Sequence, residues 1–420
     1  MKKLSILFLA LITFPLLVSA QTDNVKLDSL LQSFIDNNKA NCLTAYVAKG
    51  GNVIYKKAFG FKDIENQIPA TTDDIYVLFS QTKAITTVAF MTLVEKGLVD
   101  VNDPVSKYFP EISNEVVTKV NDDGTYETRP ASTPMTFAHL MSHSSGLGAG
   151  EVGKIRRIER MKAESANAGQ NNNPGGQRSY DGNPNSRVLG DEMKSLAKYP
   201  LGFDPGSEWN YHVSTNMLAY MVELISGKTL REYVKETILE PLDMNSTDWY
   251  FEPEYLSRFV KPYTYVDGRL EPGTMMFAQN AVGSEQSYCE GAIGLNGPID
   301  DYARFCQMLL NKGELNNVRV LKPGTVELMT TTNLLPEKNS GGKGFQFGMG
   351  FELYNALKKP TPAVSNTAYA WGGMLGTEYI IDPENDLVVL FYLNVFRRDA
   401  LYPLFLKEVY QQFVDQPEKE

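Results

Sequence analysis

The sequence predicts an α/β protein of the α+β kind, in which helices flank an antiparallel sheet built from both chain ends around an inserted, mostly helical region. Strand-like runs at residues 43–48 and 53–59 surround Lys49-Gly50-Gly51-Asn52, which is a hairpin pattern. Two more strand-like runs, 378–381 and 387–393, lie near the C-terminus. Between the two ends, helical patterns alternate with long polar loops.

Apolar residues recur at helical spacing in five segments, and each segment predicts a helix with one buried face. The predicted helices are residues 25–38, 80–96, 217–225, 300–310 and 403–413. Gly97 and Gly227 stand where the second and third of these helices are predicted to end. Residues 163–190 are rich in Asn, Gly, Gln and Pro, so we expect a long surface loop there.

The first twenty residues resemble a secretory signal peptide. Lys2 and Lys3 precede an apolar run, and the small residues Val18-Ser19-Ala20 come just before Gln21. The apolar run is short for a membrane-spanning helix, although an uncleaved anchor is the alternative. We therefore expect residues 1–20 to be removed and the protein to be exported to the periplasm or secreted, with no stable membrane insertion afterwards.

Residues 21–420 are then expected to form the folded protein. The sheet region covers about 25–104 and 291–415, and the helical region covers about 105–290. The chain carries 40 basic and 50 acidic residues, for a net charge of −10. This acidic balance argues against sequence-independent binding of nucleic acid and against adhesion to anionic lipid.

Histidine and cysteine are scarce, with three of each in 420 residues, so we expect neither a metal site nor a cofactor. Cys42, Cys289 and Cys306 are far apart, and buried free thiols are the preferred interpretation. One disulfide is the alternative, and the sequence leaves its pair open.

The segment Ser80-Gln81-Thr82-Lys83 fits the pattern Ser-x-x-Lys. On a helix, positions three apart share a face, so the hydroxyl and the amine can meet. A serine hydroxyl needs a base to become a nucleophile, and a neutral lysine amine can serve. The start of a helix also offers free N–H groups to an oxyanion. The alternative is that Ser80 only caps the helix.

Two other segments match the same pattern, Ser195-Leu196-Ala197-Lys198 and Ser340-Gly341-Gly342-Lys343. Ser340 lies in a glycine-rich stretch, and Ser195 follows the polar loop. Ser80 alone opens a long predicted helix after an apolar, aromatic run, so Ser80 is the preferred nucleophile.

Several motifs together resemble the serine β-lactamase and penicillin-binding-protein superfamily. In chain order they are Leu78-Phe79-Ser80-Gln81-Thr82-Lys83, His139-Leu140-Met141-Ser142-His143-Ser144-Ser145-Gly146-Leu147, Pro205-Gly206 before Trp209-Asn210-Tyr211, Pro241-Leu242-Asp243-Met244, Asp300-Asp301-Tyr302-Ala303-Arg304-Phe305 and Trp371-Gly372-Gly373. They span almost all of residues 25–415. The chain is most similar to the family VIII carboxylesterases, which share the class C β-lactamase fold and often carry Trp-Gly-Gly where lactamases carry Lys-Thr-Gly.

The resemblance implies three catalytic residues: Ser80 as the acylated nucleophile, Lys83 as its base, and Tyr211 as the group that moves protons to the leaving group and from water. It also implies an oxyanion hole formed by the backbone N–H groups of Ser80 and Met374. The segment Trp371-Gly372-Gly373 would line the substrate site. Without the resemblance, Tyr211 would be interpreted as a core aromatic.

The chain departs from the lactamase pattern at two places. It reads Tyr211-His212-Val213 where lactamases carry Tyr-x-Asn, and Trp371 replaces the cation that contacts a substrate carboxylate. We expect Trp371 and Val213 to form an apolar wall suited to short neutral esters, and His212 to hydrogen-bond within the cleft. Lys343, Lys358 and Lys359 are the residues that could supply the missing charge from a loop.

A Ser-His triad is the other chemistry that the histidines could suggest. No Gly-x-Ser-x-Gly segment occurs in the chain, which argues against an α/β-hydrolase. His139 and His143 fall in a segment that is structural in the resembling family, so packing roles are expected for them.

The sequence thus predicts an exported serine carboxylesterase that acts on small neutral esters through an acyl-enzyme on Ser80. One alternative is a β-lactamase or a D-alanyl carboxypeptidase or aminopeptidase that uses the same site on an amide. A catalytically silent binding protein of the same fold is the other. Retention of Ser80, Lys83 and Tyr211 together argues against the silent protein.

Overall fold

The computed structural model of the chain describes residues 24–166, 188–211, 213–273, 288–335, 341–396 and 400–415. Residues 1–20, His212 and Ser340 lie outside the described residues. Export and the contact of His212 therefore stay predictions. Among the described residues, no helix is both long enough and apolar enough to span a membrane.

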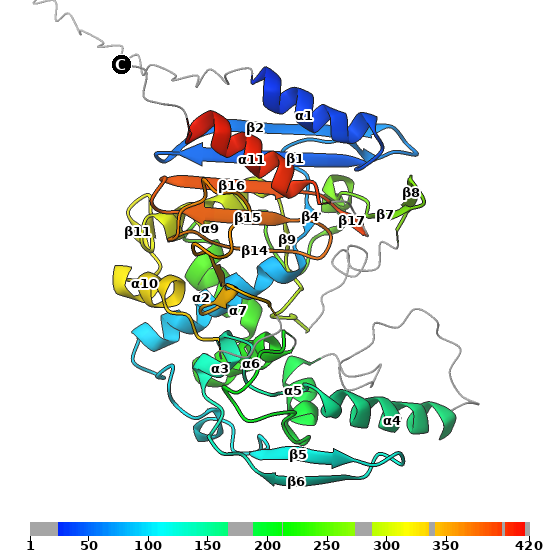
Figure 1. Ribbon diagram of the computed structural model, residues 1–420, viewed down its shortest axis with the longest axis vertical. Coiled ribbons are helices and arrows are strands. Elements are labelled where there is room, and N and C mark those ends of the chain that lie inside the picture. Colours follow the sequence, from blue (N-terminus) through cyan, green and yellow to red (C-terminus); the bar gives the residue numbers. More distant parts are fainter. Residues whose placement is uncertain are drawn as a thin grey trace, which may run out of the picture.

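One large antiparallel sheet organises the described part of the chain (Figure 1). Its strands follow the order β12-β13-β14-β15-β16-β1-β2-β3. Their bounds are β1 Cys42–Lys49, β2 Asn52–Asp63, β3 Ile68–Pro69, β12 Gln346–Phe347, β13 Glu352–Leu353, β14 Tyr369–Gly372, β15 Glu378–Asp382 and β16 Leu387–Tyr392. The N-terminal hairpin pairs directly with the C-terminal strands, because β1 lies between β2 and β16. The predicted sheet from both chain ends is confirmed.

Residues of β1 alternate between the two faces of this sheet. Leu43, Ala45 and Val47 pack in one buried cluster with α1 (Val25–Asp36) and α11 (Tyr402–Phe413). Tyr46 and Ala48 pack in the other cluster, which includes residues of α9 (Ile299–Leu310). Burial on both faces explains why this strand reads as a nearly continuous apolar run in the sequence.

The predicted helices are confirmed to within a few residues. The helix expected at 217–225 is α6 (Ser214–Ser226), and those expected at both chain ends are α1 and α11. The helix expected at 80–96 differs at its start. A 3₁₀ turn, η1 (Phe79–Gln81), precedes α2 (Thr82–Glu95), so Ser80 lies in the tighter turn and not in the α-helix.

The middle of the chain carries most of the remaining helices, and α3, α5, α6 and α7 are drawn below α9 in Figure 1. Their bounds are η2 Val105–Lys107, α3 Phe137–Met141, α4 Glu151–Ala166, α5 Leu189–Ala197, α7 Leu230–Val234, the π-helical turn η3 Lys235–Leu239, η4 Pro253–Arg258 and, later in the chain, α10 Pro323–Thr331. The loop expected at 163–190 is wrong at both ends, because α4 runs to Ala166 and α5 begins at Leu189, and residues 167–187 of this segment lie outside the described residues.

Several short strands were missed by sequence reasoning. They are β4 Tyr76–Val77, β5 Glu115–Val120, β6 Tyr126–Pro130, β7 Tyr263–Val266, β8 Arg269–Pro272, β9 Asn296–Gly297, β10 Glu314–Leu315, β11 Val318–Arg319 and β17 Val395–Phe396. The β5–β6 hairpin lies at the end of the molecule opposite α1 (Figure 1). Every residue of β6 is exposed, so this strand lacks the alternation of apolar and polar residues that predicts a strand.

Asp382 ties the end of β15 to two other parts of the fold. Its fully buried carboxylate accepts hydrogen bonds from Ser365 N (3.0 Å), Tyr410 OH (2.7 Å) and Asn385 Nδ2 (2.8 Å). The folded protein loses stability when buried donors lose such an acceptor, because no water takes its place.

Asp382→Asn should lower the free energy of unfolding by about 2–4 kcal/mol, since three donors lose a charged acceptor at Oδ2 and the new amide nitrogen at the Oδ1 position faces the Asn385 N–H donor. Urea denaturation measures the change. Asp386→Asn is the matched control in the same turn, because Asp386 is exposed and its positive φ of 48° suits asparagine equally well. The control should change the free energy by less than about 0.5 kcal/mol. Equal effects of the two substitutions would contradict this account.

Candidate active site

Ser80 lies in a strained turn between the sheet and α2. Phe79, the residue before it, has a φ of +47°, which a bulky side chain rarely adopts and which costs on the order of 1–2 kcal/mol. The Phe79 ring is buried with Phe251, Phe259 and Leu375, and this packing holds the conformation. The N-cap of α2 is Gln81, so Ser80 does not cap the helix.

Buried tyrosines hold this turn from the side of the sheet. Tyr302 OH donates to the Gln81 carbonyl at 2.9 Å, and Tyr392 OH donates to Gln81 Oε1 at 2.6 Å. Tyr302 comes from α9 and Tyr392 from β16, and both are fully buried. Sequence reasoning missed both contacts, although Tyr302 lies in a motif that it singled out.

Lys83 brings its ammonium group to the Ser80 hydroxyl. Lys83 Nζ lies 3.1 Å from Ser80 Oγ and 3.0 Å from the carbonyl oxygen of Ala292. The residue is 4% exposed, so these protein acceptors take the place of water. The side chains of Ser80 and Lys83, which are three positions apart, therefore lie close together in the structure, as predicted.

Tyr211 joins Lys83 to the edge of the sheet. Lys83 Nζ lies 4.6 Å from the centre of the Tyr211 ring, and Trp371 Nε1 donates to Tyr211 OH at 2.9 Å. The Tyr211 and Trp371 rings are 5.1 Å apart between centres. Tyr211 is thus not an ordinary core aromatic, because its hydroxyl and its ring face different polar partners.

Gly373 allows β14 to approach the Ser80 turn closely. A Cβ atom at this position would lie 2.4 Å from the Leu78 carbonyl oxygen and 2.2 Å from Thr377 Oγ1. Thr377 Oγ1 donates to that same Leu78 carbonyl at 3.1 Å, and Gly373 N donates to the Thr377 carbonyl at 2.6 Å. The segment that carries Met374 is therefore held against the turn that carries Ser80.

These residues meet at a cavity of about 400 Å³. Its lining combines the predicted site residues with aromatic and acidic side chains. The lining residues are Ser80, Tyr211, Glu352, Tyr354, Ala370, Trp371, Gly372, Gly373, Met374, Glu378, Tyr379 and Tyr402. Lys83 contacts Ser80 but is not itself among the lining residues. Glu352 and Glu378 were missed, since single glutamates in strands carry no signal in one sequence.

One expectation about the cavity wall is wrong, and two of the lysines that could supply the missing charge are engaged elsewhere. Val213 does not join Trp371 in the wall, because it is fully buried at the start of α6 and packs in the core. Lys358 and Lys359 do not supply a free cation. Lys358 Nζ pairs with Glu352 at 2.9 Å, and Lys359 Nζ donates to the Val364 carbonyl at 2.7 Å. Lys343 is exposed and does not line the cavity.

The two described histidines pack as expected. The His143 ring is buried with its centre 4.6 Å from the centre of the Tyr211 ring. His139 Nδ1 accepts a hydrogen bond from Thr136 N at 3.1 Å, within a capping arrangement at the start of α3. Burial lowers the pKa of His139, so its ring is neutral near pH 7.

The three cysteines are buried free thiols, and the preferred interpretation is confirmed. Burial raises the pKa of Cys42 and of Cys289 to about 12, so these thiols stay neutral and are poor nucleophiles. Among the described residues, no three His, Cys, Asp or Glu side chains gather as metal ligands would.

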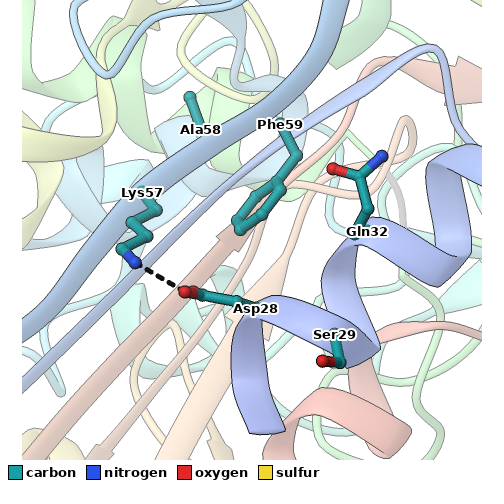
Figure 2. Close-up of a pocket in the computed structure, with 6 residues that line it drawn as sticks. All are labelled: Asp28, Ser29, Gln32, Lys57, Ala58 and Phe59. Atoms are coloured by element: carbon teal, nitrogen blue, oxygen red, sulfur yellow. Dashed lines mark hydrogen bonds and ion pairs between the residues drawn. The ribbon is translucent and has the colours of Figure 1, made fainter. Parts of the chain in front are cut away.

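A second hollow lies between α1 and β2, and Figure 2 shows the residues that line it. Lys57 Nζ forms an ion pair with Asp28 at 2.6 Å across this hollow. Asp28 also accepts from Tyr55 OH at 2.8 Å. The charged groups here serve to attach α1 to β2, and none of the predicted site residues lies among them.

Comparisons with known proteins agree with the fold. A family model described as Beta-lactamase matches residues 27–404. Esterase EstB of Burkholderia gladioli is 27% identical over 398 residues, which cover 88% of this chain and 90% of EstB. Simvastatin synthase (LovD) of Aspergillus terreus has the same fold, with a TM-score of 0.75, 22% identity and coverage of 93% and 99%. A penicillin-binding protein homologue from Pyrococcus abyssi matches with a TM-score of 0.66, 24% identity and coverage of 95% and 79%.

Because the His139 ring is neutral in the folded protein, the free energy of unfolding should decrease as the pH falls. The pKa of His139 in the folded protein is lower than in the unfolded chain, where it is roughly 6.5. Its contribution to stability is therefore present above pH 6.5 and is lost as the pH falls through the lowered pKa, because the unfolded chain binds the proton more tightly.

His139→Gln keeps an acceptor for Thr136 N but does not titrate. Between pH 7.5 and 5, the free energy of unfolding should therefore fall less steeply for this variant than for the unsubstituted protein. At pH 7.5, where both side chains are neutral acceptors, the stability of the variant should lie within about 1 kcal/mol of that of the unsubstituted protein, because the cap is kept. Urea denaturation at several pH values measures both quantities, and equal slopes would contradict the assignment.

Proposed function

The chain belongs to the Beta-lactamase family and is a serine hydrolase of that family, and from this premise we propose that it is a carboxylesterase for small neutral esters. The observation that carries the proposal is Trp371. This indole stands at the cavity where a carboxylate-binding cation would be needed, and its one N–H group is engaged by Tyr211 at 2.9 Å.

The proposed acylation begins at Ser80. Lys83, as the neutral amine, takes the Ser80 proton over their 3.1 Å contact while Ser80 Oγ attacks the ester carbonyl carbon. The backbone N–H groups of Ser80 and Met374 donate to the resulting oxyanion. Tyr211 delivers a proton to the alcohol oxygen as the ester C–O bond breaks. The alcohol leaves, and the acyl group stays on Ser80.

Deacylation repeats these steps with water as the nucleophile. Tyr211, which gave its proton to the alcohol, takes a proton from the water as the water attacks the acyl carbon, and the carbonyl oxygen again becomes the oxyanion. When the bond to Ser80 Oγ breaks, Ser80 recovers its proton from Lys83. The products are the carboxylic acid and the free serine, so the protons balance over the cycle.

The charges around the cavity support an ester over a β-lactam. A β-lactam carries a carboxylate, and a charge-assisted hydrogen bond to it contributes roughly 1.5–3 kcal/mol. Among the described residues, no lysine or arginine lines the cavity, whereas Glu352 and Glu378 do. Lys358 pairs with one of these carboxylates. The name of EstB, an esterase, is in keeping with the proposal.

Ser80→Ala should abolish labelling by a fluorophosphonate and lower ester turnover by roughly 10⁴-fold or more, because the acyl acceptor is lost. The folded state should persist, since Ser80 caps no helix. Ser195→Ala, which changes another Ser-x-x-Lys segment on α5, is the matched control and should leave labelling unchanged. Labelling that survives Ser80→Ala but disappears in Ser195→Ala would overturn the assignment.

The substrate preference is tested by kcat/KM for a short-chain p-nitrophenyl ester and for nitrocefin on one preparation. The ester value should be the larger, because no lysine or arginine of the described residues lines the cavity to meet the lactam carboxylate. A lactam value equal to or above the ester value would favour the β-lactamase alternative.

Two substitutions of Trp371 separate the effect of an added charge from the effect of losing the indole. Trp371→Phe and Trp371→Lys both remove the hydrogen bond to Tyr211, but only the lysine adds a cation. The ratio of lactam to ester kcat/KM should be about tenfold higher in Trp371→Lys than in Trp371→Phe. Equal ratios would mean that this position does not face the substrate carboxylate.

A further inference from the structure

Lys83 has a second hydrogen-bond acceptor besides Ser80. Lys83 Nζ donates to the backbone carbonyl of Ala292 at 3.0 Å and to Ser80 Oγ at 3.1 Å. Since Lys83 is 4% exposed, water does not compete for this contact. The distance from Lys83 to Ser80 therefore depends on where the protein holds the Ala292 carbonyl.

Ala292 lies in a short turn that is wedged between α2 and α6. Ala292 N donates to Asn216 Oδ1 at 2.8 Å, and Asn216 is a fully buried residue of α6. Thr86 Oγ1 of α2 donates to the Gly291 carbonyl at 2.7 Å. A Cβ atom at Gly291 would lie 2.3 Å from Ala219 Cβ, so the turn has no room to shift toward α6.

Glu290 and the Ala292 N–H group together fix which way the Asn216 amide points. Asn216 Nδ2 donates to Glu290 Oε1 at 3.2 Å. An asparagine amide can rotate by half a turn and exchange its oxygen and nitrogen with little change of shape. With Glu290 as the acceptor for the nitrogen, the oxygen faces Ala292 N. The Glu290 backbone is itself held, because Trp249 Nε1 donates to its carbonyl at 3.0 Å.

We propose that Glu290 is a positioning residue for acylation of Ser80: it orients Asn216, which holds the Ala292 carbonyl that anchors Lys83. The inference deepens the proposed function and rests on it. Glu290 does not line the cavity, so it touches no substrate and acts on Ser80 through Asn216, Ala292 and Lys83. Asn216 follows Val213 by one helical turn. Its amide is directed at Ala292, whose carbonyl anchors Lys83, and not at the substrate.

The charges around Glu290 define when its carboxyl group is ionised. Burial raises the pKa of Glu290 to about 7, although the hydrogen bond from Asn216 opposes this. The carboxylate of Glu192 on α5 also raises it, and the charge of Lys83 lowers it. Glu192 itself accepts from Tyr288 OH at 2.6 Å. Above pH 7 the ionised Glu290 accepts the Asn216 hydrogen bond more strongly than the neutral acid does.

Glu290→Gln tests the proposal, because glutamine resembles the neutral acid and cannot ionise. The readout is the rate at which a fluorophosphonate labels Ser80 between pH 5.5 and 8.5. The variant should match the unsubstituted protein at pH 5.5 and be roughly fivefold slower at pH 8.5. With a neutral p-nitrophenyl ester at pH 8.5, kcat should fall while KM stays unchanged.

Glu223→Gln is the matched control. Glu223 is on the same helix as Asn216, burial raises its pKa too, and it accepts from Leu230 N at 2.9 Å without contact to Asn216. This control should label as the unsubstituted protein does at every pH. A purely structural role for Glu290 would instead slow labelling equally at pH 5.5 and 8.5, and that result would overturn the proposal.

Asn216→Asp provides an independent test if Glu290→Gln fails to fold. Two facing carboxyl groups share one proton at low pH but repel one another once both are ionised. Labelling should then be near normal at pH 5.5 and at least tenfold slower at pH 8.5. A rate independent of pH in both variants would overturn the positioning role, whereas absence of labelling in the unsubstituted protein would overturn the proposed function itself.

Discussion

The burial of Lys83 is the constraint on which the rest of the site depends. A lysine nitrogen that is 4% exposed needs hydrogen-bond partners from the protein, because it has lost those of water. The structure provides three partners from three places in the chain: the Ser80 hydroxyl, the Ala292 carbonyl and the face of the Tyr211 ring. Because Lys83 contacts Ser80, each group that binds Lys83 also lies close to Ser80.

The large sheet supplies the rigid side of this arrangement. The Ser80 turn is held by a tyrosine from β16 and one from α9, and by Thr377, which follows β14 by a few residues. These segments come from the C-terminal half of the chain, whereas the turn lies near residue 80. Closing the sheet between both chain ends is therefore a condition for assembling the cavity, and the strained Phe79 conformation persists because this packing surrounds it.

Sequence reasoning located much of the site but misplaced part of its wall. Val213 follows Tyr211 by two positions and was expected to face the substrate. It instead faces the core, because it begins α6 and the helix turns its side chain inward. Glu352 and Glu378 reach the cavity from two strands on either side of β14, and nothing in their local sequence distinguishes them from surface residues. The Glu290–Asn216 contact likewise joins residues 74 positions apart.

By itself, the sequence determined what depends on short spacing: the hairpin of β1 and β2, the amphipathic helices, and the approach of Lys83 to Ser80 over three positions. These follow from backbone geometry that one segment carries alone. Only the tertiary structure decided which tyrosines hold the turn, how closely Gly373 lets β14 approach Leu78, and which way the Asn216 amide points. Such contacts depend on the packing of whole elements against one another, and a single sequence carries no record of those distances.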